Sequence, residues 1–489
     1  MPRASFPPVP SFRDVGAFKA HLATLAIPLG CDEELQPAGS GALAQPLEVE
    51  GRRIGNRFCI HPMGGFDGTP DGKATELVTR RWVNFGRSGA KLIWGGEALA
   101  VRREARDNPF QLYYHPDNRA SHEKLLRDLR SAHRDRFGTT EDLLVGLQIT
   151  HSGRFARPDL DFKPQPRVAY RHPLLDARVG ITDDRAVLGD AELDDLIGEF
   201  ATTAKWAQAA GFDFVDVKQC HGYLLHEFLS AHTRPGRYGG SFENRTRLFR
   251  EIVAAIRREA PGLLIGTRVS VFDMPPFQKN PADDSGEPAD YRAALPYRYG
   301  FGLDPNRPTE QDLTEPFALL RLCEELGVRL VNISGGSPYY NPHIQRPARF
   351  PPCDGYWPPE DPLLGCARQI EITRRCKQAF PNLILVGSAY SYLQEYLAHV
   401  AQAQVRLGQV DFVGIGRLSF AYPDYPHDLL YGSGVTRKRL CRTDSDCTTA
   451  PRNRLVSGCY PYDPFYRSLP EAEKLRQIKR AARFSEPRA

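Results

Sequence analysis

The chain has 489 residues, is 41% hydrophobic and carries a formal net charge of +5. This length supports a large core in one or two domains, and the even spread of Lys and Arg argues against nucleic-acid binding. No apolar run approaches the ~18 residues of a membrane span, the N-terminus lacks the apolar region of a signal peptide, and the ten cysteines are scattered, so we expect a cytoplasmic protein with reduced thiols.

Short apolar segments rich in β-branched residues alternate with segments of helical periodicity. Strands are predicted at 56–62, 90–95, 143–149, 212–218, 263–269, 328–334, 383–388 and 410–416. Helices are predicted at 74–88, 117–136, 191–210, 242–259, 311–326, 364–379 and 390–406. Apolar strands separated by helices indicate a parallel sheet of the α/β class, and eight such units predict a (β/α)8 TIM barrel. A doubly wound sheet is the alternative, but no Gly-rich phosphate turn follows the first strand.

The barrel is expected to occupy residues 46–431. An N-terminal extension at 1–45 precedes it, with a short helical pattern around 15–25, and a C-terminal tail at 432–489 follows it. The end of the tail, "PEAEKLRQIKRAARF", predicts an exposed helix. The chain is therefore expected to be one barrel domain with two appendages.

Three long irregular segments, at 152–190, 274–310 and 335–363, each follow a predicted strand and precede a predicted helix. In a barrel all three emerge on the C-terminal face, which is where barrel enzymes place their active sites. Loops of this length usually act as lids or binding loops. We expect them to set substrate specificity.

The predicted strands end in polar residues that a barrel would bring together. Lys218, His221 and Tyr223 follow the fourth strand, and Gln148 and Arg268 lie at the ends of the third and fifth. The turns after strands seven and eight offer small residues and a guanidinium group for a phosphate, as barrels commonly do at this place. The residues of these two turns are Gly387, Ser388, Gly416 and Arg417.

Five motifs resemble the Old Yellow Enzyme family of flavin-dependent oxidoreductases, nearest its 2,4-dienoyl-CoA reductase branch. They are "NRFCIHPMGG", "LQITHSGR", "AGFDFVDVKQCHGYLLHEFLS", "YGGSFENRTRLF" and "VDFVGIGR", and the resemblance covers about residues 45–430. It implies a barrel that binds FMN non-covalently and takes electrons from NAD(P)H. It also implies reduction of an activated C=C bond of the enone or enoate type in a small-molecule substrate.

The resemblance also implies cofactor-binding residues. Pro62, Met63 and Gly64 would back the flavin ring, and Glu97 and Ala98 would lie against its edge. Gln148 would bond the pyrimidine side, and Arg268 would lie near N1 and O2, where a fixed cation favours reduction. The phosphate would be held by Gly387, Ser388, Gly416 and Arg417.

For catalysis, the family pattern H-x-x-[HN]-G-Y implies that two polar side chains grip the substrate oxygen and that the tyrosine donates a proton. His221 and Tyr223 match this pattern, whereas Lys218 replaces its first member. Lys218 would stabilise an enolate oxygen, bind a carboxylate, or pair with Glu97 or another acid. Asp216 and Cys220 are interpreted as packing or helix-facing groups.

The tail contains "CRTDSDCTTAPRNRLVSGC", at the place where the dienoyl-CoA reductase branch carries a four-iron, four-sulfur cluster on C-x2-C-x3-C-x11-C. Cys447 and Cys459 keep the last spacing, but Cys441 is one residue too close and Asp444 stands where the second cysteine belongs. Such a cluster requires four thiolates. We therefore expect no iron–sulfur cluster and no other metal.

Three other functions remain open from the sequence. Related barrels catalyse flavin-dependent amine oxidation or N-demethylation, and a lysine at a strand end suits a Schiff-base lyase, here through Lys218. A flavin-binding protein without turnover is the third. The sequence does not choose between NADH and NADPH, does not identify the natural substrate and leaves a homo-oligomer open.

Overall fold

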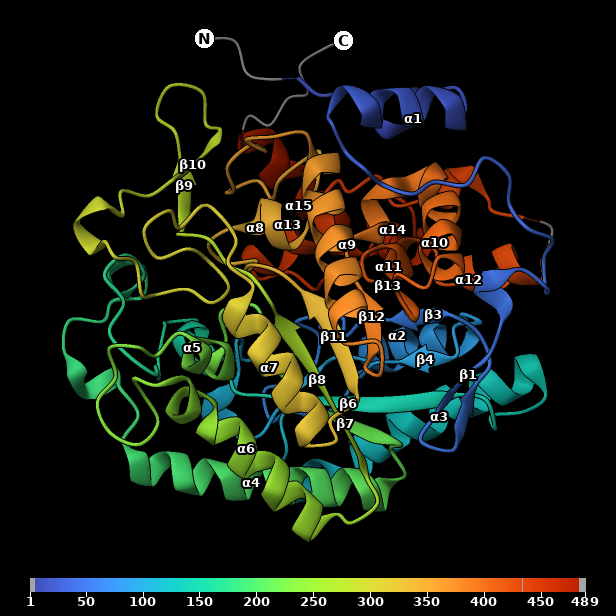
Figure 1. Cartoon of the computed structure of the whole chain (residues 1–489). Coiled ribbons are helices and arrows are strands. Elements are labelled where there is room, and N and C mark those ends of the chain that lie inside the picture. The colour runs from blue at the N-terminus through green and yellow to red at the C-terminus, as the bar shows by residue number, and fades with distance from the viewer. Residues whose placement is uncertain (1–4, 433, 483–489) are drawn as a thin grey trace.

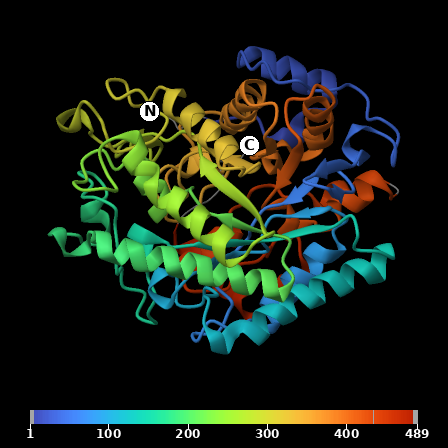
Figure 2. The same ribbon diagram turned by 60° about the horizontal axis from the view of Figure 1, so that its bottom comes forward.

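The computed structural model describes residues 5–432 and 434–482, and at its centre eight parallel strands form a closed barrel (Figures 1 and 2). The strands run in the order β4-β3-β13-β12-β11-β8-β7-β6, and a pairing of β4 with β6 closes the ring. Their bounds are β3 Phe58–Ile60, β4 Leu92–Ile93, β6 Leu144–Thr150, β7 Phe214–Val217, β8 Leu264–Ser270, β11 Leu330–Ser334, β12 Ile384–Gly387 and β13 Phe412–Ile415. A short ninth strand, β5 Ala98–Ala100, pairs with the end of β6. The predicted barrel and its eight strands are confirmed.

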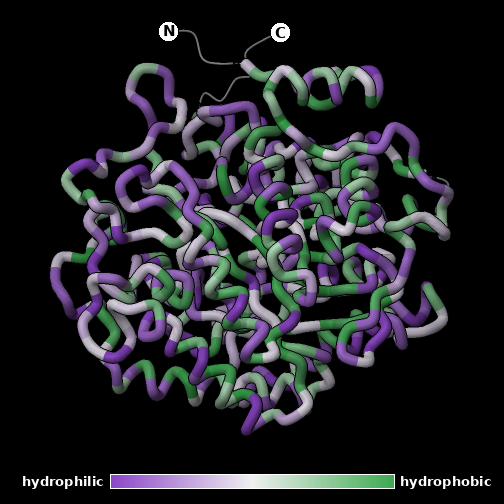
Figure 3. Tube along the Cα trace, viewed as in Figure 1, coloured by the Kyte–Doolittle hydropathy of each residue, from purple (hydrophilic) through white to green (hydrophobic). Residues whose placement is uncertain are grey.

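Helices wrap the outside of the barrel, as the predicted alternation requires (Figure 1). They are α2 Glu76–Arg87, α3 Arg119–Phe137, α4 Asp190–Ala210, α6 Phe242–Glu259, α7 Thr314–Glu325, α9 Pro362–Ala379 and α10 Leu397–Arg406, with the short helices α5 Leu224–Leu229, α11 Leu418–Ala421 and α12 Tyr425–Leu430 between them. Helix α4 buries four apolar residues that are three or four positions apart, namely Leu193, Leu196, Phe200 and Ala204. Figure 3 shows hydrophobic and hydrophilic residues alternating along this helix. Helix α4 covers the strands through this apolar face.

One predicted helix is interrupted in the structure. The pattern at 390–406 predicted a single helix, but the structure has a 3-10 segment, Tyr390–Tyr396, followed by α10. Gln394 breaks the helix because its backbone adopts φ 51° and ψ −112°. Apolar periodicity does not report such a local change of dihedral angles.

The lower half of the barrel is filled with apolar side chains, including Trp94, Phe214 and Phe412. A Cβ at Gly146 would lie 2.2 Å from the Phe214 ring, so glycine is required for this packing. A hairpin of β1 Leu47–Val49 and β2 Arg52–Ile54 packs against the same cluster. Apolar side chains thus close this end of the barrel, and the polar side chains that can take part in a reaction lie at the C-terminal ends of the strands.

Helix α1, Val15–Thr24, confirms the helical pattern of the N-terminal extension. The C-terminal tail contains α13 Asp446–Arg452, α14 Pro464–Ser468 and α15 Pro470–Ala481, and it packs against the barrel. Arg80 on α2 forms an ion pair of 2.8 Å with Asp463, and the amide of Ser457 donates to the carbonyl of Gly65 at 2.7 Å. The helix predicted to be exposed at the end of the tail buries Ala472 and Leu475, so exposure was only half right.

Two smaller elements belong to the long loops: the hairpin of β9 Phe277–Lys279 and β10 Gly286–Pro288, and α8 Pro342–Gln345. In the part of the chain that the structure describes, no helix combines the length and apolar content needed to cross a membrane.

Candidate active site

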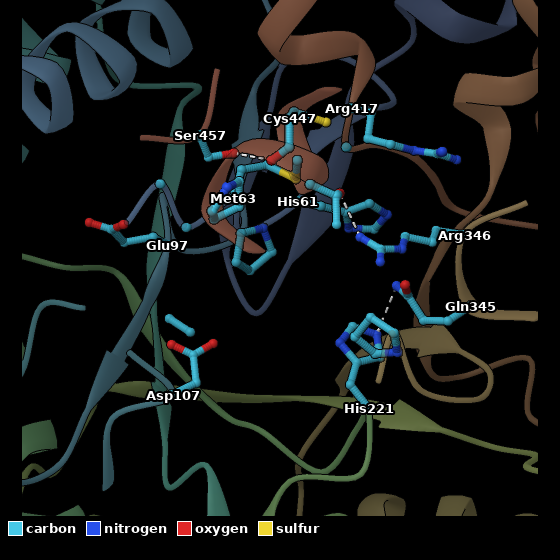
Figure 4. A pocket seen from close by; sticks show the side chains of 18 of the residues that line it. His61, Met63, Glu97, Asp107, His221, Gln345, Arg346, Arg417, Cys447 and Ser457 are labelled. Carbon is cyan, nitrogen blue, oxygen red and sulfur yellow. Dashed lines mark hydrogen bonds between the residues drawn. The ribbon is translucent and has the colours of Figure 1, made fainter. Parts of the chain in front are cut away.

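A cavity of about 330 Å³ lies at the C-terminal ends of the barrel strands (Figure 4). This is within the range of small-molecule and cofactor sites. Nearly all the site residues expected from the sequence line this one cavity. They are Pro62, Met63, Gly64, Glu97, Ala98, Gln148, Lys218, His221, Tyr223, Arg268, Ser388, Gly416 and Arg417. Gly387 is the exception: it ends β12, next to Tyr390 and Val410, and is not part of the lining.

Asp216 organises one wall of the cavity. The strand register places Gln148 of β6 opposite Asp216 of β7. The Asp216 carboxylate accepts hydrogen bonds from Gln148 Nε2 at 2.6 Å, from Trp94 Nε1 at 2.6 Å and from the Arg268 amide at 2.7 Å. Because the Gln148 amide nitrogen is occupied, its carbonyl oxygen remains to accept from a ligand. The sequence was interpreted as giving Asp216 a packing or helix-facing role; the structure shows it fully buried, where it also orients the wall through these hydrogen bonds.

Arg268 is a buried cation without an acidic partner among the described residues. Its side chain makes one long hydrogen bond, 3.4 Å from Nη2 to Ser388 Oγ, and its Nε has no partner. Burial lowers its pKa. His61 bonds Asn332 and the same serine, and burial together with Arg268 holds the pKa of this histidine well below its ordinary value, so it is neutral. A guanidinium buried in this way requires an acceptor from a ligand.

Two further arginines lie on the side of the cavity opposite Glu97 (Figure 4). Arg417 donates from Nη2 to the Pro347 carbonyl at 2.6 Å, and its Nη1 is buried without a partner. Arg346 donates to Thr448 Oγ1 of the tail at 2.7 Å. Neither forms an ion pair within the described chain. This side is therefore suited to an anionic group.

Tyr223 forms a hydrogen-bonded triangle with two other groups. Its hydroxyl lies 2.6 Å from Asp107 Oδ2 and 2.8 Å from the hydroxyl of Tyr339, which also donates to Asp107 at 3.1 Å. Burial, reinforced by the Asp107 carboxylate, raises the pKa of Tyr223 well above its ordinary value. Tyr223 is therefore protonated over the whole neutral range.

His221 is held in an unusual backbone conformation, with φ 68° in the left-handed region. Its amide donates to Ser270 Oγ at 3.0 Å, while its Nε2 lies 3.0 Å from Ser334 Oγ and 3.3 Å from Gln345 Nε2. Burial, then Arg268 and Lys218, lowers the pKa of His221 well below its ordinary value. The imidazole is neutral, and the strained backbone is typical of a functional position.

Lys218 lies beside Tyr223, with Nζ 3.7 Å from the centre of the tyrosine ring. The side chain is 6% exposed and forms neither a hydrogen bond nor an ion pair among the described residues. Glu97, its suggested partner, is instead bound by Arg81 at 3.0 Å, and burial raises the pKa of Glu97 to about 7. Burial lowers the pKa of Lys218. The sequence left three roles open for Lys218, and the described residues do not include an acid that pairs with it.

Sequence reasoning missed part of the cavity wall. Asp107 comes from the segment between β5 and α3, and Pro338, Tyr339, Gln345 and Arg346 come from the loop at 335–363. The position of both segments after a strand was the available signal. Of the three long loops, only 335–363 contributes residues to the lining of this cavity. Phe155, in the loop at 152–190, stacks on Tyr339, and Phe277, in the loop at 274–310, packs on His343.

The comparison with known proteins agrees with this geometry. The sequence model of the NADH:flavin oxidoreductase / NADH oxidase family matches residues 42–285, about half of the chain. The chain belongs to this family. Family membership confirms the prediction of an FMN-dependent oxidoreductase that uses NAD(P)H.

Individual relatives are distant. This NADH:flavin oxidoreductase family member is 26% identical over 396 residues to an NADH:flavin oxidoreductase of Gibberella zeae, covering 78% of this chain and 83% of that protein. It is 29% identical over 244 residues to an NADPH dehydrogenase of Geobacillus sp., covering 48% of this chain and 64% of that enzyme. A solved structure of 2-naphthoyl-CoA reductase shares the fold, with a TM-score of 0.63, 15% identity and coverage of 89% of this chain and 58% of that chain. The chain thus spans less than two thirds of the latter two proteins.

The cavity of this family member fits FMN. The buried Nε of Arg268 and Nη1 of Arg417 lack partners, which marks two places where a ligand must supply acceptors. The two arginines at one side suit a phosphate, and the free oxygen of Gln148, in the wall that Asp216 joins to Arg268, suits the polar edge of a heterocycle. A mononucleotide carries these two groups at opposite ends.

The tail cysteines lie close to this cavity. Cys447 lines it, and Cys441 and Cys459 are buried, with the pKa of Cys441 raised to about 12 by burial. We predict that anaerobically prepared protein contains almost no iron or acid-labile sulfide, because Asp444 replaces one of the four thiolates. Colorimetric assays of both elements check this, and about four irons per chain would show that a non-cysteine ligand completes a cluster.

Proposed function

We propose that this protein reduces an activated C=C bond of an enone or enoate, using FMN and NAD(P)H. The observation that carries the proposal is the convergence of Tyr223, His221 and Lys218 at the cavity that also holds Arg268 and Gln148. A protonated tyrosine, a neutral histidine and a cation there form an acid next to a group that polarises an oxygen.

Each residue then has a role. FMN, when bound, supplies the hydride that reaches the β-carbon. Because the Gln345 amide donates to Nε2, the neutral ring of His221 carries its proton on Nδ1, and this N–H holds the electron-withdrawing oxygen of the substrate while Gln345 and Ser334 orient the ring. Tyr223 transfers its hydroxyl proton to the α-carbon. Arg268, fixed in place before the reaction, favours negative charge on the side of the cavity where Gln148 lies.

Residues around Tyr223 influence the stability of the negative charge that this tyrosine carries after it donates its proton. A tyrosinate next to the Asp107 carboxylate would place two negative charges side by side, at a hydrogen-bond distance of 2.6 Å. The Lys218 ammonium, 3.7 Å from the ring centre, offsets this charge. Tyr339 is 38% exposed and bonds both Tyr223 and Asp107, so it links the donor to solvent protons.

Anaerobic mixing tests the proposal. NADH or NADPH should bleach the yellow holoenzyme, and an enone should restore its colour with formation of the saturated ketone. A methylated amine should leave the oxidised enzyme yellow. Bleaching by the amine, together with no effect of enones or enoates on the reduced enzyme, would favour amine oxidation instead.

The Asp107 contact leads to a prediction on pH dependence. Because Asp107 helps to raise the pKa of Tyr223, the wild-type donor stays protonated as the pH rises to and beyond about 10. In Asp107→Asn the pKa of Tyr223 falls toward its ordinary value, so enone reduction by pre-reduced enzyme should decline at a lower pH than in wild type. A pH–rate profile of this step measures the shift, and an alkaline limb that does not move would contradict the assignment.

A further inference from the structure

We propose that the substrate carries a carboxylate and that Lys218 is the residue that binds it. This deepens the proposed function, on which it rests only in taking the substrate to occupy the cavity described above. The inference begins from the charges that line this cavity.

Four cations of the lining have no acidic partner among the described residues. They are Lys218, Arg268, Arg346 and Arg417. The fifth cation, Arg452, is paired with Asp354 at 2.7 Å. Of the two acids in the lining, Glu97 is bound by Arg81, and Asp107 accepts from two tyrosines. The lining therefore has an excess of positive charge that ligands must balance.

The cations fall into separate groups. Arg346 and Arg417 lie together on one side of the cavity, where a phosphate with two negative charges would satisfy both (Figure 4). The side chain of Arg268 lies next to Ser388, and its backbone amide donates to Asp216, in the same wall as Gln148. Lys218 alone in this set lies against Tyr223, the proposed proton donor. A substrate at Tyr223 therefore meets a cation that the cofactor's phosphate does not neutralise.

A carboxylate satisfies this cation better than a carbonyl oxygen does. Removing an ammonium from water is unfavourable, and a neutral dipole offsets this cost poorly, whereas an opposite charge with a hydrogen bond offsets it well. The nearest acids, Asp107 and Asp216, form no ion pair with Nζ within 4.0 Å and accept hydrogen bonds from other donors. His221 and Gln345 remain to hold the carbonyl oxygen, so the two substrate groups have separate binding residues.

Binding of a keto acid and of its ester to the oxidised holoenzyme tests the inference without turnover. By calorimetry, 4-oxopentanoate should bind the wild type, and Lys218→Met should weaken it about 100-fold, as expected for loss of one partner of a buried charge pair. Affinity for methyl 4-oxopentanoate should hardly change. Lys218→Arg should restore part of the affinity for the acid, and Arg452→Met, at a lining arginine that is already paired with Asp354, is the matched control. Loss of acid binding in Arg452→Met but not in Lys218→Met would overturn the assignment, as would equal losses for acid and ester.

Turnover separates this inference from the proposed function. With (E)-4-oxopent-2-enoate and its methyl ester, Lys218→Met should lower kcat/KM about 100-fold more for the acid than for the ester, because loss of the ammonium beside Tyr223 affects both compounds alike and loss of a carboxylate ligand affects only the acid. If wild type reduces neither compound yet binds the acid through Lys218, the proposed function fails and the carboxylate site stands. If Lys218→Met slows both compounds equally, the reductase stands and the carboxylate site fails.

Two controls address the other possible states of Lys218. Because the wild type keeps an unpaired charge buried, substrate-free Lys218→Met holoprotein should melt at the same temperature as wild type or above it. A marked drop in Tm would reveal a hidden ion partner and overturn the proposal. Treatment of wild type with 4-oxopentanoate and cyanoborohydride should give no covalent adduct, because an adduct on Lys218 would make it a nucleophile rather than a carboxylate ligand.

Discussion

Replacing Tyr223 by phenylalanine should slow enone reduction by pre-reduced enzyme by about 10²–10⁴-fold, the usual contribution of a positioned acid. The ring and its contact with Lys218 remain, and only the hydroxyl that bonds Asp107 and Tyr339 is removed. Reduction of the enzyme by NAD(P)H needs no proton from this residue and should be nearly unchanged. Stopped-flow absorbance of the two half-reactions measures both rates.

The matched control is Tyr339→Phe, which removes a hydroxyl from the same triangle without removing the donor. Its effect on enone reduction should be much smaller than that of Tyr223→Phe. Equal slowing of both half-reactions in Tyr223→Phe would defeat the donor assignment, since a structural defect rather than a lost proton would then explain the loss.

Replacing Arg417 by alanine should raise the Kd for FMN by about 10- to 150-fold. Hydrogen bonds to charged groups contribute roughly 1.5–3 kcal/mol, and each 1.4 kcal/mol is about tenfold in affinity. The free Nη1 of Arg417 lies on the side of the cavity that suits the phosphate, and the only hydrogen bond of this side chain within the described chain runs from Nη2 to the Pro347 carbonyl. Fluorescence titration of apoprotein with FMN gives the two dissociation constants.

Arg452→Ala is the control for general loss of positive charge, because this arginine also lines the cavity but is already paired with Asp354. It should leave FMN affinity within a few fold of wild type. An unchanged affinity for FMN in Arg417→Ala would contradict the assignment of Arg417 to the phosphate. A large loss of FMN affinity in Arg452→Ala would instead indicate that the phosphate lies nearer the tail.

The barrel could be predicted because its strands are continuous apolar segments buried on both faces, a pattern that helices of the surface do not share. The same pattern located Gln148 and Arg268, since residues at strand ends converge in a barrel. Pairing of Lys218 with Glu97 was one of the roles that the sequence left open, and the structure shows that Glu97 is bound by Arg81 instead.

Other parts of the site depend on contacts between segments far apart in the chain. Asp107 and Tyr223 are 116 residues apart in the sequence, and the residues on either side of Asp107 do not indicate its hydrogen bond with Tyr223. The hydrogen bond between Arg346 and Thr448 likewise joins a barrel loop to the tail across 102 residues. The hydrogen-bonding role of Asp216 could not be predicted, because its neighbours in sequence are apolar and its three donors come from distant segments of the barrel.

The central claim is that this cavity delivers hydride to the β-carbon of a substrate and a proton from Tyr223 to its α-carbon. Isotope labelling of the product tests it most directly. Reduction of an enone in D2O with unlabelled NAD(P)H should place one deuterium at the α-carbon, and reduction in H2O with deuterated NAD(P)H should place one at the β-carbon. Solvent deuterium at the β-carbon, or no saturated product at all, would contradict the account.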